Sequence, residues 1–203
     1  MALSNVQKGA VGQFAFLSTA LATGGGGVEA YVPVADNERR DAEVRRHLKP
    51  TPGITLQVKV AFTASAYGGP RSKYLRIVFS VRDKRLETDA RFWYFFALYE
   101  ASQLRLHDPC FLIPSGVFHK IGRDGRPAKG LHWFSITANL EPHSRDKWSR
   151  FRVAPKDLGK RLLEVIDEAP LTSSRKSLKL PPDAIWLARA RRSTPVALRH
   201  RAA

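Results

Sequence analysis

The most constraining feature of the sequence is a strict alternation of side-chain types over residues 54–61. Four aliphatic residues alternate with four that are polar or small: Ile54, Leu56, Val58 and Val60 with Thr55, Gln57, Lys59 and Ala61. A period of two is typical of a β-strand with one buried face. The stretch therefore predicts a strand, and the side chains of Gln57 and Lys59 are expected to project from the same face of it.

A shorter alternation precedes this strand. Ala42 and Val44 would share one face of a strand, and Asp41 and Glu43 the other. Residues 50–53, Pro-Thr-Pro-Gly, are typical of a turn between two strands. If the strands pair as a hairpin, a carboxylate, an amide oxygen and an ammonium group converge. Oxygen ligands of this kind can hold Mg²⁺, which polarises a phosphate and lowers the pKa of bound water, while a nearby lysine offsets negative charge.

The order of these residues resembles the PD-(D/E)xK nuclease motif, with Asp41 followed 16 positions later by Gln57-Val58-Lys59. It is more narrowly similar to the intron-encoded bacterial homing endonucleases, in which Gln precedes x-Lys. Three further stretches carry the resemblance: residues 8–15 for the opening K-G-x-x-G helix, residues 31–34 for the strand leading to the aspartate, and residues 111–114 for the closing strand. The resemblance covers roughly the first 120 residues, with a thinner continuation over residues 148–166.

The resemblance implies a Mg²⁺-dependent endonuclease that hydrolyses DNA phosphodiester bonds. Asp41 would bind the metal, and the Gln57 side-chain oxygen would add a ligand or hold a water. Lys59 would orient the attacking water and offset charge on the phosphate. Asp36 is a competing candidate for the motif aspartate, but it lies in a predicted turn rather than at a strand, so Asp41 is preferred.

One departure from the family motif bears on activity. Where the family has Glu in the opening helix, this chain has Gln13, which would complete the site only as a neutral oxygen donor. Asp41 would then be the one firm anionic ligand, with Glu43 or Glu29 as substitutes, and Mg²⁺ should bind weakly until DNA phosphates contribute oxygens. Alternatives therefore stay open: a solvated Asp–Lys pair without function, a nuclease-fold protein that binds DNA without cutting it, or a basic RNA- or ribosome-associated protein.

The net charge favours a nucleic acid as the partner. The chain has 34 Lys and Arg against 18 Asp and Glu, a net charge of +16, and each cation that meets a phosphate releases condensed counterions. The candidate contacts to double-stranded DNA are the basic residues of two predicted loops and of the carboxyl-terminal segment: Arg71, Lys73, Arg123, Arg126, Lys129, Arg189, Arg191 and Arg192. Because cutting both strands needs two sites, a homodimer is expected.

Other patterns predict an α/β fold. Ala10, Phe14, Leu17 and Leu21 repeat with helical period in a helix over residues 8–22, which Gly24 to Gly27 would end. Further strands are predicted over residues 28–34, 73–81, 92–99, 109–113 and 131–137, and a closing helix from Pro155 with a buried face of Leu158, Leu162, Val165 and Ile166. The expected fold is a restriction-endonuclease-like core, a mixed central sheet flanked by helices.

We expect one nuclease-type domain over residues 1–170, with a β-excursion over 115–153 that includes a glycine-rich loop over 120–130, and a basic, poorly ordered tail over 171–203. Cys110 is the only cysteine, which excludes an intramolecular disulfide and a Cys-based zinc cluster. No apolar run reaches the ~18 residues of a membrane span, and the amino terminus lacks the apolar region after a basic cluster that is typical of a signal peptide. These observations favour a cytoplasmic, nucleoid-associated protein without a membrane partner.

Overall fold

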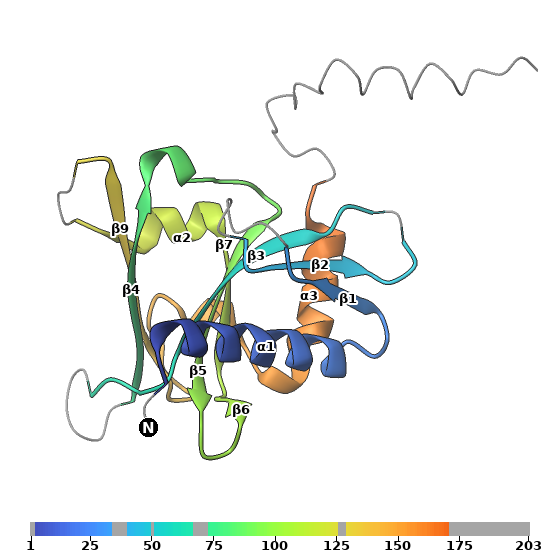
Figure 1. Ribbon diagram of the computed structural model, residues 1–203, viewed down its shortest axis with the longest axis horizontal. Coiled ribbons are helices and arrows are strands. Elements are labelled where there is room, and N and C mark those ends of the chain that lie inside the picture. The colour runs from blue at the N-terminus through green and yellow to red at the C-terminus, as the bar shows by residue number, and fades with distance from the viewer. Residues whose placement is uncertain (1–2, 34–39, 50, 67–72, 126–128, 171–203) are drawn as a thin grey trace, which may run out of the picture. The chain divides into compact units, whose positions relative to one another are not determined.

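A computed structural model describes residues 3–33, 40–49, 51–66, 73–125 and 129–170 of the chain (Figure 1). Several of the sequence-based expectations lie outside these residues. They concern the competing acid Asp36, the loop residues Arg71 and Arg126, and the tail over 171–203 with Arg189, Arg191 and Arg192.

A mixed seven-stranded sheet forms the middle of the fold (Figure 1). Its order is β1-β2-β3-β5-β7-β10, with β6 paired to β5. Strands β3 and β5 run parallel, and the other pairs described in this sheet are antiparallel. The strands are β1 (Val28–Tyr31), β2 (Ala42–Arg46), β3 (Ile54–Ala61), β5 (Phe92–Glu100), β6 (Arg105–Leu106), β7 (Cys110–Pro114) and β10 (Arg152–Val153).

A second, three-stranded sheet has the order β4-β9-β8. Its strands are β4 (Tyr74–Arg82), β9 (Leu131–Asn139) and β8 (Arg123–Asp124), and β4 and β9 pair antiparallel along their whole length. The side chains of Leu75, Val81, Phe134 and Ile136 are buried and pack with the central strands β5 and β7. Helix α2 (Ser115–Ile121) lies between the two sheets and contributes the buried Phe118 to this cluster (Figure 1).

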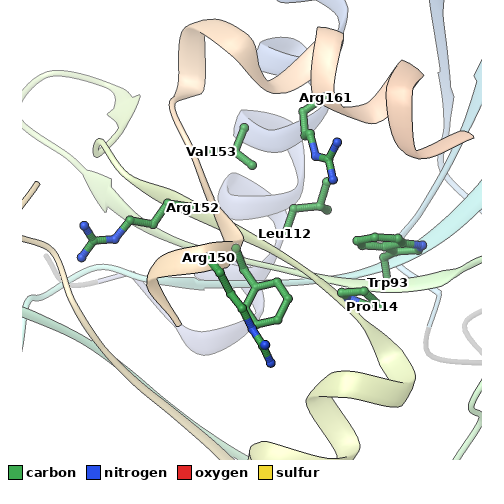
Figure 2. Close-up of a pocket in the computed structure, with 8 residues that line it drawn as sticks. Trp93, Leu112, Pro114, Arg150, Arg152, Val153 and Arg161 are labelled. Atoms are coloured by element: carbon green, nitrogen blue, oxygen red, sulfur yellow. The ribbon is translucent and has the colours of Figure 1, made fainter. Parts of the chain in front are cut away.

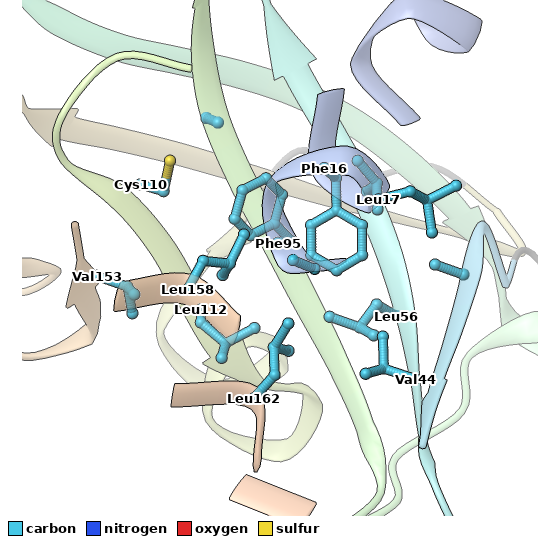
Figure 3. Close-up of a cluster of buried hydrophobic side chains, with 14 of the residues drawn as sticks. Phe16, Leu17, Val44, Leu56, Phe95, Cys110, Leu112, Val153, Leu158 and Leu162 are labelled. Atoms are coloured by element: carbon cyan, nitrogen blue, oxygen red, sulfur yellow. The ribbon is translucent and has the colours of Figure 1, made fainter. Parts of the chain in front are cut away.

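Helices α1 (Asn5–Thr23) and α3 (Leu158–Glu168) cover the other face of the central sheet. Figure 3 shows Phe16 and Leu17 of α1, Leu158 and Leu162 of α3, and Leu56 and Phe95 of the sheet gathered in one cluster. The rings of Phe16 and Phe95 lie 4.7 Å apart. Gly12 lets α1 approach this closely, since a Cβ there would lie 2.8 Å from the Cβ of Val60. The second glycine of the K-G-x-x-G stretch therefore has a packing role, whereas a Cβ at Gly9 would meet nothing within 4 Å.

The predicted α/β class, with a mixed central sheet flanked by helices, is confirmed. The alternation over residues 54–61 corresponds to β3, whose Ile54, Leu56 and Val58 are buried, and the predicted face of the closing helix is buried. Gly25 and Gly26 adopt positive φ at the end of α1, as expected. In the described part of the chain, no helix is both long enough and apolar enough to cross a membrane.

Two predicted elements differ from the structure. The first helix begins at Asn5, earlier than expected, because Ser4 and Gln7 form a capping box. The loop predicted over residues 120–130 is partly wrong, since α2 extends to Ile121 and β8 covers Arg123–Asp124. A helix of seven residues makes only about two turns, so its sequence carries little periodic signal.

The apolar stripe predicted for the first helix is also partly wrong. Leu17 is buried, but Phe14 is 65% exposed and Leu21 is 47% exposed. The helix instead buries Gly12, Phe16, Leu17 and Ala20. Helix α1 thus carries apolar residues on two faces, and only one of them packs in the described fold.

Candidate active site

The antiparallel hairpin of β2 and β3 positions Asp41. The register pairs Ala42 with Leu56, and the main-chain N–H of Asp41 donates to the Leu56 carbonyl at 2.8 Å. Continuing the register by one residue places Asp41 opposite Gln57. The carboxylate oxygen Oδ2 of Asp41 accepts a hydrogen bond of 2.8 Å from the N–H of Val58. The aspartate is therefore held against β3 by both its main chain and its side chain.

Lys59 lies on the same face of β3 as Gln57, and its side chain reaches the carboxylate of Asp41. Its Nζ is 3.6 Å from Asp41 Oδ2, and the two side chains are 31% and 25% exposed. The separation is longer than a hydrogen bond, so the two groups form a loose ion pair. The structure thus brings together the acid and the amine that the sequence motif pairs.

Gln57 lies opposite Asp41 and two residues before Lys59 on β3, and its side chain is only 3% exposed. In the parallel register of β3 and β5 it is aligned with Tyr94. A glutamine on the outer face of an edge hairpin would be solvated, whereas a buried amide requires polar partners. Gln57 is therefore enclosed within the fold and is not part of an open surface.

Gln13 reaches the same aspartate from helix α1. Its Nε2 donates a hydrogen bond to the main-chain carbonyl oxygen of Asp41. This contact requires the amide nitrogen to face Asp41, which directs the side-chain oxygen elsewhere. Gln13 consequently positions the backbone of Asp41 and does not contact its carboxylate through an oxygen.

Neither substitute carboxylate joins Asp41 directly. Glu43 lies opposite Thr55, and its Oε1 accepts a 2.8 Å hydrogen bond from Arg45. Glu29, on β1, lies opposite Arg45 of β2. Arg45 is four residues beyond Asp41, which is about 13 Å along β2 at the usual rise per residue.

The carboxylate of Glu29 also has partners of its own. It accepts a hydrogen bond from the Tyr31 hydroxyl and contacts His47 Nδ1, each at 2.6 Å. These two contacts hold the pKa of Glu29 below its usual value. Glu29 is therefore engaged away from the site, and within the part of the chain that the structure describes, Asp41 is the carboxylate that pairs with Lys59.

A polar network beside the site was missed in the sequence analysis, in which His119 has no assigned role. The Tyr94 hydroxyl is 2.9 Å from His119 Nε2, and Thr88 Oγ1 is 2.8 Å from His119 Nδ1. Burial lowers the pKa of His119 to about 4, with a smaller contribution from the nearby His132. A neutral His119 therefore links Thr88 to Tyr94, which is aligned with Gln57.

The segment that contains Thr88 also contacts the residue before Asp41. Arg40, which precedes Asp41, donates from Nη2 to both carboxylate oxygens of Glu87, at 2.9 and 3.0 Å. Glu87 is adjacent to Thr88 in the chain. No spacing rule relates these residues, because they come from separate elements that only the tertiary fold brings together.

The described basic candidates do not gather at Asp41. Lys73, Arg123 and Lys129 are all exposed and belong to the second sheet and its connections. Lys73 precedes β4 and Lys129 precedes β9, so they lie near opposite ends of a ladder of nine residue pairs, about 27 Å long. A duplex that touched both would have to run along the second sheet.

A hollow of about 170 Å³ on the opposite face of the central sheet contains three arginines (Figure 2). Trp93 and Val153 in its wall belong with the α1 and α3 cluster. Arg161 pairs with Glu164 at 2.9 Å, and Arg152 donates to the carbonyls of Asn139 and Pro142, each at 2.7 Å. Two of the three guanidinium groups are therefore engaged within the fold, and Arg150 lies over the ring of Phe151.

The donor atoms at Asp41 suit only a metal that shares its coordination with a substrate. Within the described residues, no group of three or more His, Cys, Asp or Glu side chains is arranged to hold a metal ion. The site offers one carboxylate and the amide oxygen of Gln57. Mg²⁺ is commonly bound by one or two carboxylates together with waters and substrate phosphates, so this donor set fits a Mg²⁺ ion that arrives with a phosphate.

Comparisons with known proteins were made at the level of sequence and of fold. No family model and no curated protein sequence matches the chain. Among solved structures, the chain is similar to that of a bacterial homing endonuclease, I-Ssp6803I, with a TM-score of 0.49 and 15% sequence identity. The similarity covers 82% of this chain and 97% of the other.

Proposed function

We propose that this chain is a Mg²⁺-dependent endonuclease that hydrolyses phosphodiester bonds in double-stranded DNA. The observation that carries the proposal is the 3.6 Å approach of Lys59 Nζ to Asp41 Oδ2 from adjacent strands. An ion pair on an open surface contributes little to stability. Here the aspartate is also held by the Val58 N–H and lies opposite a buried Gln57, which is the arrangement expected of a pre-organised site.

Each residue has a distinct role in this proposal. Asp41 and the side-chain oxygen of Gln57 would hold the ion, with phosphate oxygens and waters completing its shell. When bound, Mg²⁺ polarises the scissile phosphate and lowers the pKa of the attacking water. Lys59 would orient that water and offset the negative charge that develops on the phosphate. Gln13 would keep the main chain of Asp41 in place through its hydrogen bond to the carbonyl.

The charge of the chain supports DNA as the substrate. The net charge is +16, and Lys73, Arg123 and Lys129 are exposed on the second sheet, where they would contact phosphates. The same role is proposed for Arg71 and Arg126 and for the tail residues Arg189, Arg191 and Arg192. Removal of any one of these cations should weaken binding to all duplex sequences and reduce its salt dependence.

Nicking of supercoiled plasmid in Mg²⁺ tests the proposal. Asp41→Asn and Lys59→Met should each slow nicking by about 100-fold or more, because each removes a group that acts on the phosphate or on the water. Asp167→Asn and Lys160→Met are matched controls, since they remove the same charges from exposed positions on helix α3. The controls should nick as the wild type does, and all variants should retain duplex binding. Equal nicking by the wild type and by both site variants would overturn the proposal.

A second candidate function is DNA binding without cleavage. It is favoured by Gln13, whose amide nitrogen rather than an oxygen faces Asp41, so that the site has one firm anion. Gln13→Glu discriminates between the two functions. A large gain in metal-dependent nicking over an inactive wild type would favour a binding protein with an impaired site, whereas nicking by the wild type itself would favour the nuclease. Tight, salt-sensitive binding to RNA but not to duplex DNA would instead favour the RNA-associated alternative.

A further inference from the structure

Arg40, the residue before Asp41, is held by a carboxylate from a distant part of the chain. Its Nη2 donates to both oxygens of Glu87, at 2.9 and 3.0 Å, and the two side chains are 18% and 38% exposed. Glu87 lies in the connection between β4 and β5, so the pair ties this connection to the start of the β2–β3 hairpin. The guanidinium group next to the proposed metal ligand is therefore engaged by an acid when no DNA is bound.

The segment around Glu87 is fastened on both sides of that residue. Before it, Leu86 packs against the apolar cluster that joins the two sheets. After it, the main-chain N–H of Asp89 donates to the Ser115 hydroxyl at 3.1 Å, and that hydroxyl donates to the Asp89 carbonyl at 2.9 Å. A carboxylate presented by a fixed segment loses less freedom on pairing than one on an unsupported loop. The Arg40–Glu87 pair is therefore a feature of the fold and not a chance meeting of two surface side chains.

A phosphate can take the place of Glu87 in this pair. Arginine binds carboxylates and phosphates alike, through two or more oxygens. An ion pair with a carboxylate that is 38% exposed contributes little to stability, so the exchange costs little. The proposed site also needs more positive charge than Lys59 supplies, and the exposed basic residues of the second sheet do not gather at Asp41. Arg40, one residue from Asp41, can supply it.

We propose that Arg40 is a phosphate-binding residue of the Asp41 site and that Glu87 holds it in a self-inhibited pair until DNA arrives. This inference rests on the proposed function, which puts a DNA phosphate beside Asp41. When a duplex binds, a phosphate oxygen replaces the Glu87 carboxylate at the guanidinium group. Arg40 and Lys59 then offset the charge of the phosphate together. The competing role is purely structural, with the pair serving only to fasten residue 40 to the β4–β5 connection.

Binding of the full chain to a short duplex without divalent metal, over a range of salt, tests the inference without cleavage. Glu87→Gln should tighten binding about three- to fivefold, because the ion pair no longer has to be broken. Arg40→Gln should weaken binding and reduce its salt dependence by about one counterion. Glu164→Gln is the matched control: Glu164 is 44% exposed and lies 2.9 Å from Arg161, on helix α3 behind the central sheet. The control should change binding far less than Glu87→Gln does.

The double variant Arg40→Gln, Glu87→Gln separates inhibition from a structural role. Because the gain from Glu87→Gln requires the guanidinium group, the double variant should bind no more tightly than Arg40→Gln alone. If the pair only fastens residue 40, the two single variants break the same contact and should change binding in the same direction. Arg40→Lys keeps the charge and should bind between the wild type and Arg40→Gln, which keeps the test open if far-UV circular dichroism shows Arg40→Gln to be unfolded.

Two results would overturn the inference: a folded Glu87→Gln variant that binds the duplex no more tightly than the wild type, or a double variant that gains over Arg40→Gln as much as Glu87→Gln gains over the wild type. Nicking in Mg²⁺ is read separately. A chain that shows the expected binding pattern but does not nick would contradict the proposed cleavage and still support the exchange of Glu87 for a phosphate at Arg40.

Discussion

The two faces of strand β3 differ in what they contribute to the molecule. On one face Ile54, Leu56 and Val58 are buried beneath helices α1 and α3. On the other face Gln57 is buried as a polar group, and Lys59 is partly exposed beside an aspartate. Both faces share one backbone and one set of ladder hydrogen bonds. The first face therefore supplies stability, whereas the second carries the polar groups of the proposed site at a cost in stability.

Leu56→Ala should have the largest effect on stability. Leu56 is fully buried, and truncation of a buried leucine costs about 2–5 kcal/mol. Urea unfolding would measure this loss. Thr55→Ala, at the neighbouring position on the other face, should cost far less. Equal losses from the two variants would show that the faces do not divide stability and chemistry between them.

Gln13→Glu should destabilise the metal-free chain by about 1–3 kcal/mol, because the carboxylate cannot donate to the Asp41 carbonyl and leaves it without this hydrogen bond. A second carboxylate near Asp41 should at the same time strengthen metal binding. Thermal unfolding with and without Mn²⁺ would measure both effects. We expect Mn²⁺ to raise the midpoint of Gln13→Glu more than that of the wild type. A variant as stable as the wild type without metal would contradict the role assigned to Gln13.

Gln57→Leu should separate stability from activity. Replacing a buried amide by an apolar side chain of similar size leaves its polar partners unsatisfied and should cost about 1–3 kcal/mol. The same change removes the proposed oxygen ligand and should abolish nicking. Urea unfolding and the plasmid assay on one preparation would test the pair of outcomes. Retained nicking would remove Gln57 from the site, and a loss of stability well beyond this range would assign it a structural role instead.

His119 should produce the smallest effect, as a dependence of stability on pH. Its pKa is about 4 in the folded chain, lowered by burial, so between pH 6.5 and about 4 the unfolded chain binds the additional proton. The stability that neutral His119 contributes is complete above pH 6.5 and is lost as the pH falls through this window. Urea midpoints should fall more steeply with decreasing pH for the wild type than for His119→Gln. The control His143→Gln removes an exposed histidine and should keep the wild-type slope.

The hairpin and its flanking elements could be predicted because their patterns are local. The alternation in β3 and the helical period of Leu158, Leu162 and Val165 each report one buried face, and the turn residues report where the chain reverses. Asp41, Gln57 and Lys59 could be placed on one face for the same reason. None of this required knowledge of what covers each face.

What the sequence could not reveal depends on contacts between distant elements. The burial of Gln57 follows from its alignment with Tyr94 on the parallel neighbour β5, and a strand's own pattern does not contain that register. The link from Thr88 through His119 to Tyr94 joins three separate elements. For α1, the period identifies apolar faces but cannot tell the face that packs from the one that carries Phe14.

Metal binding with and without DNA tests the central claim most directly, namely that Asp41 binds Mg²⁺ together with the scissile phosphate. The measurement compares Lys59→Met, which should not cut, with the double variant Asp41→Asn, Lys59→Met, by Mn²⁺ titration with and without a short duplex and with the duplex alone as the blank. We predict that the duplex tightens Mn²⁺ binding at least about tenfold when Asp41 is present, and leaves it unchanged in the double variant. If the two proteins bind Mn²⁺ with equal affinity in the presence of the duplex, the claim is contradicted.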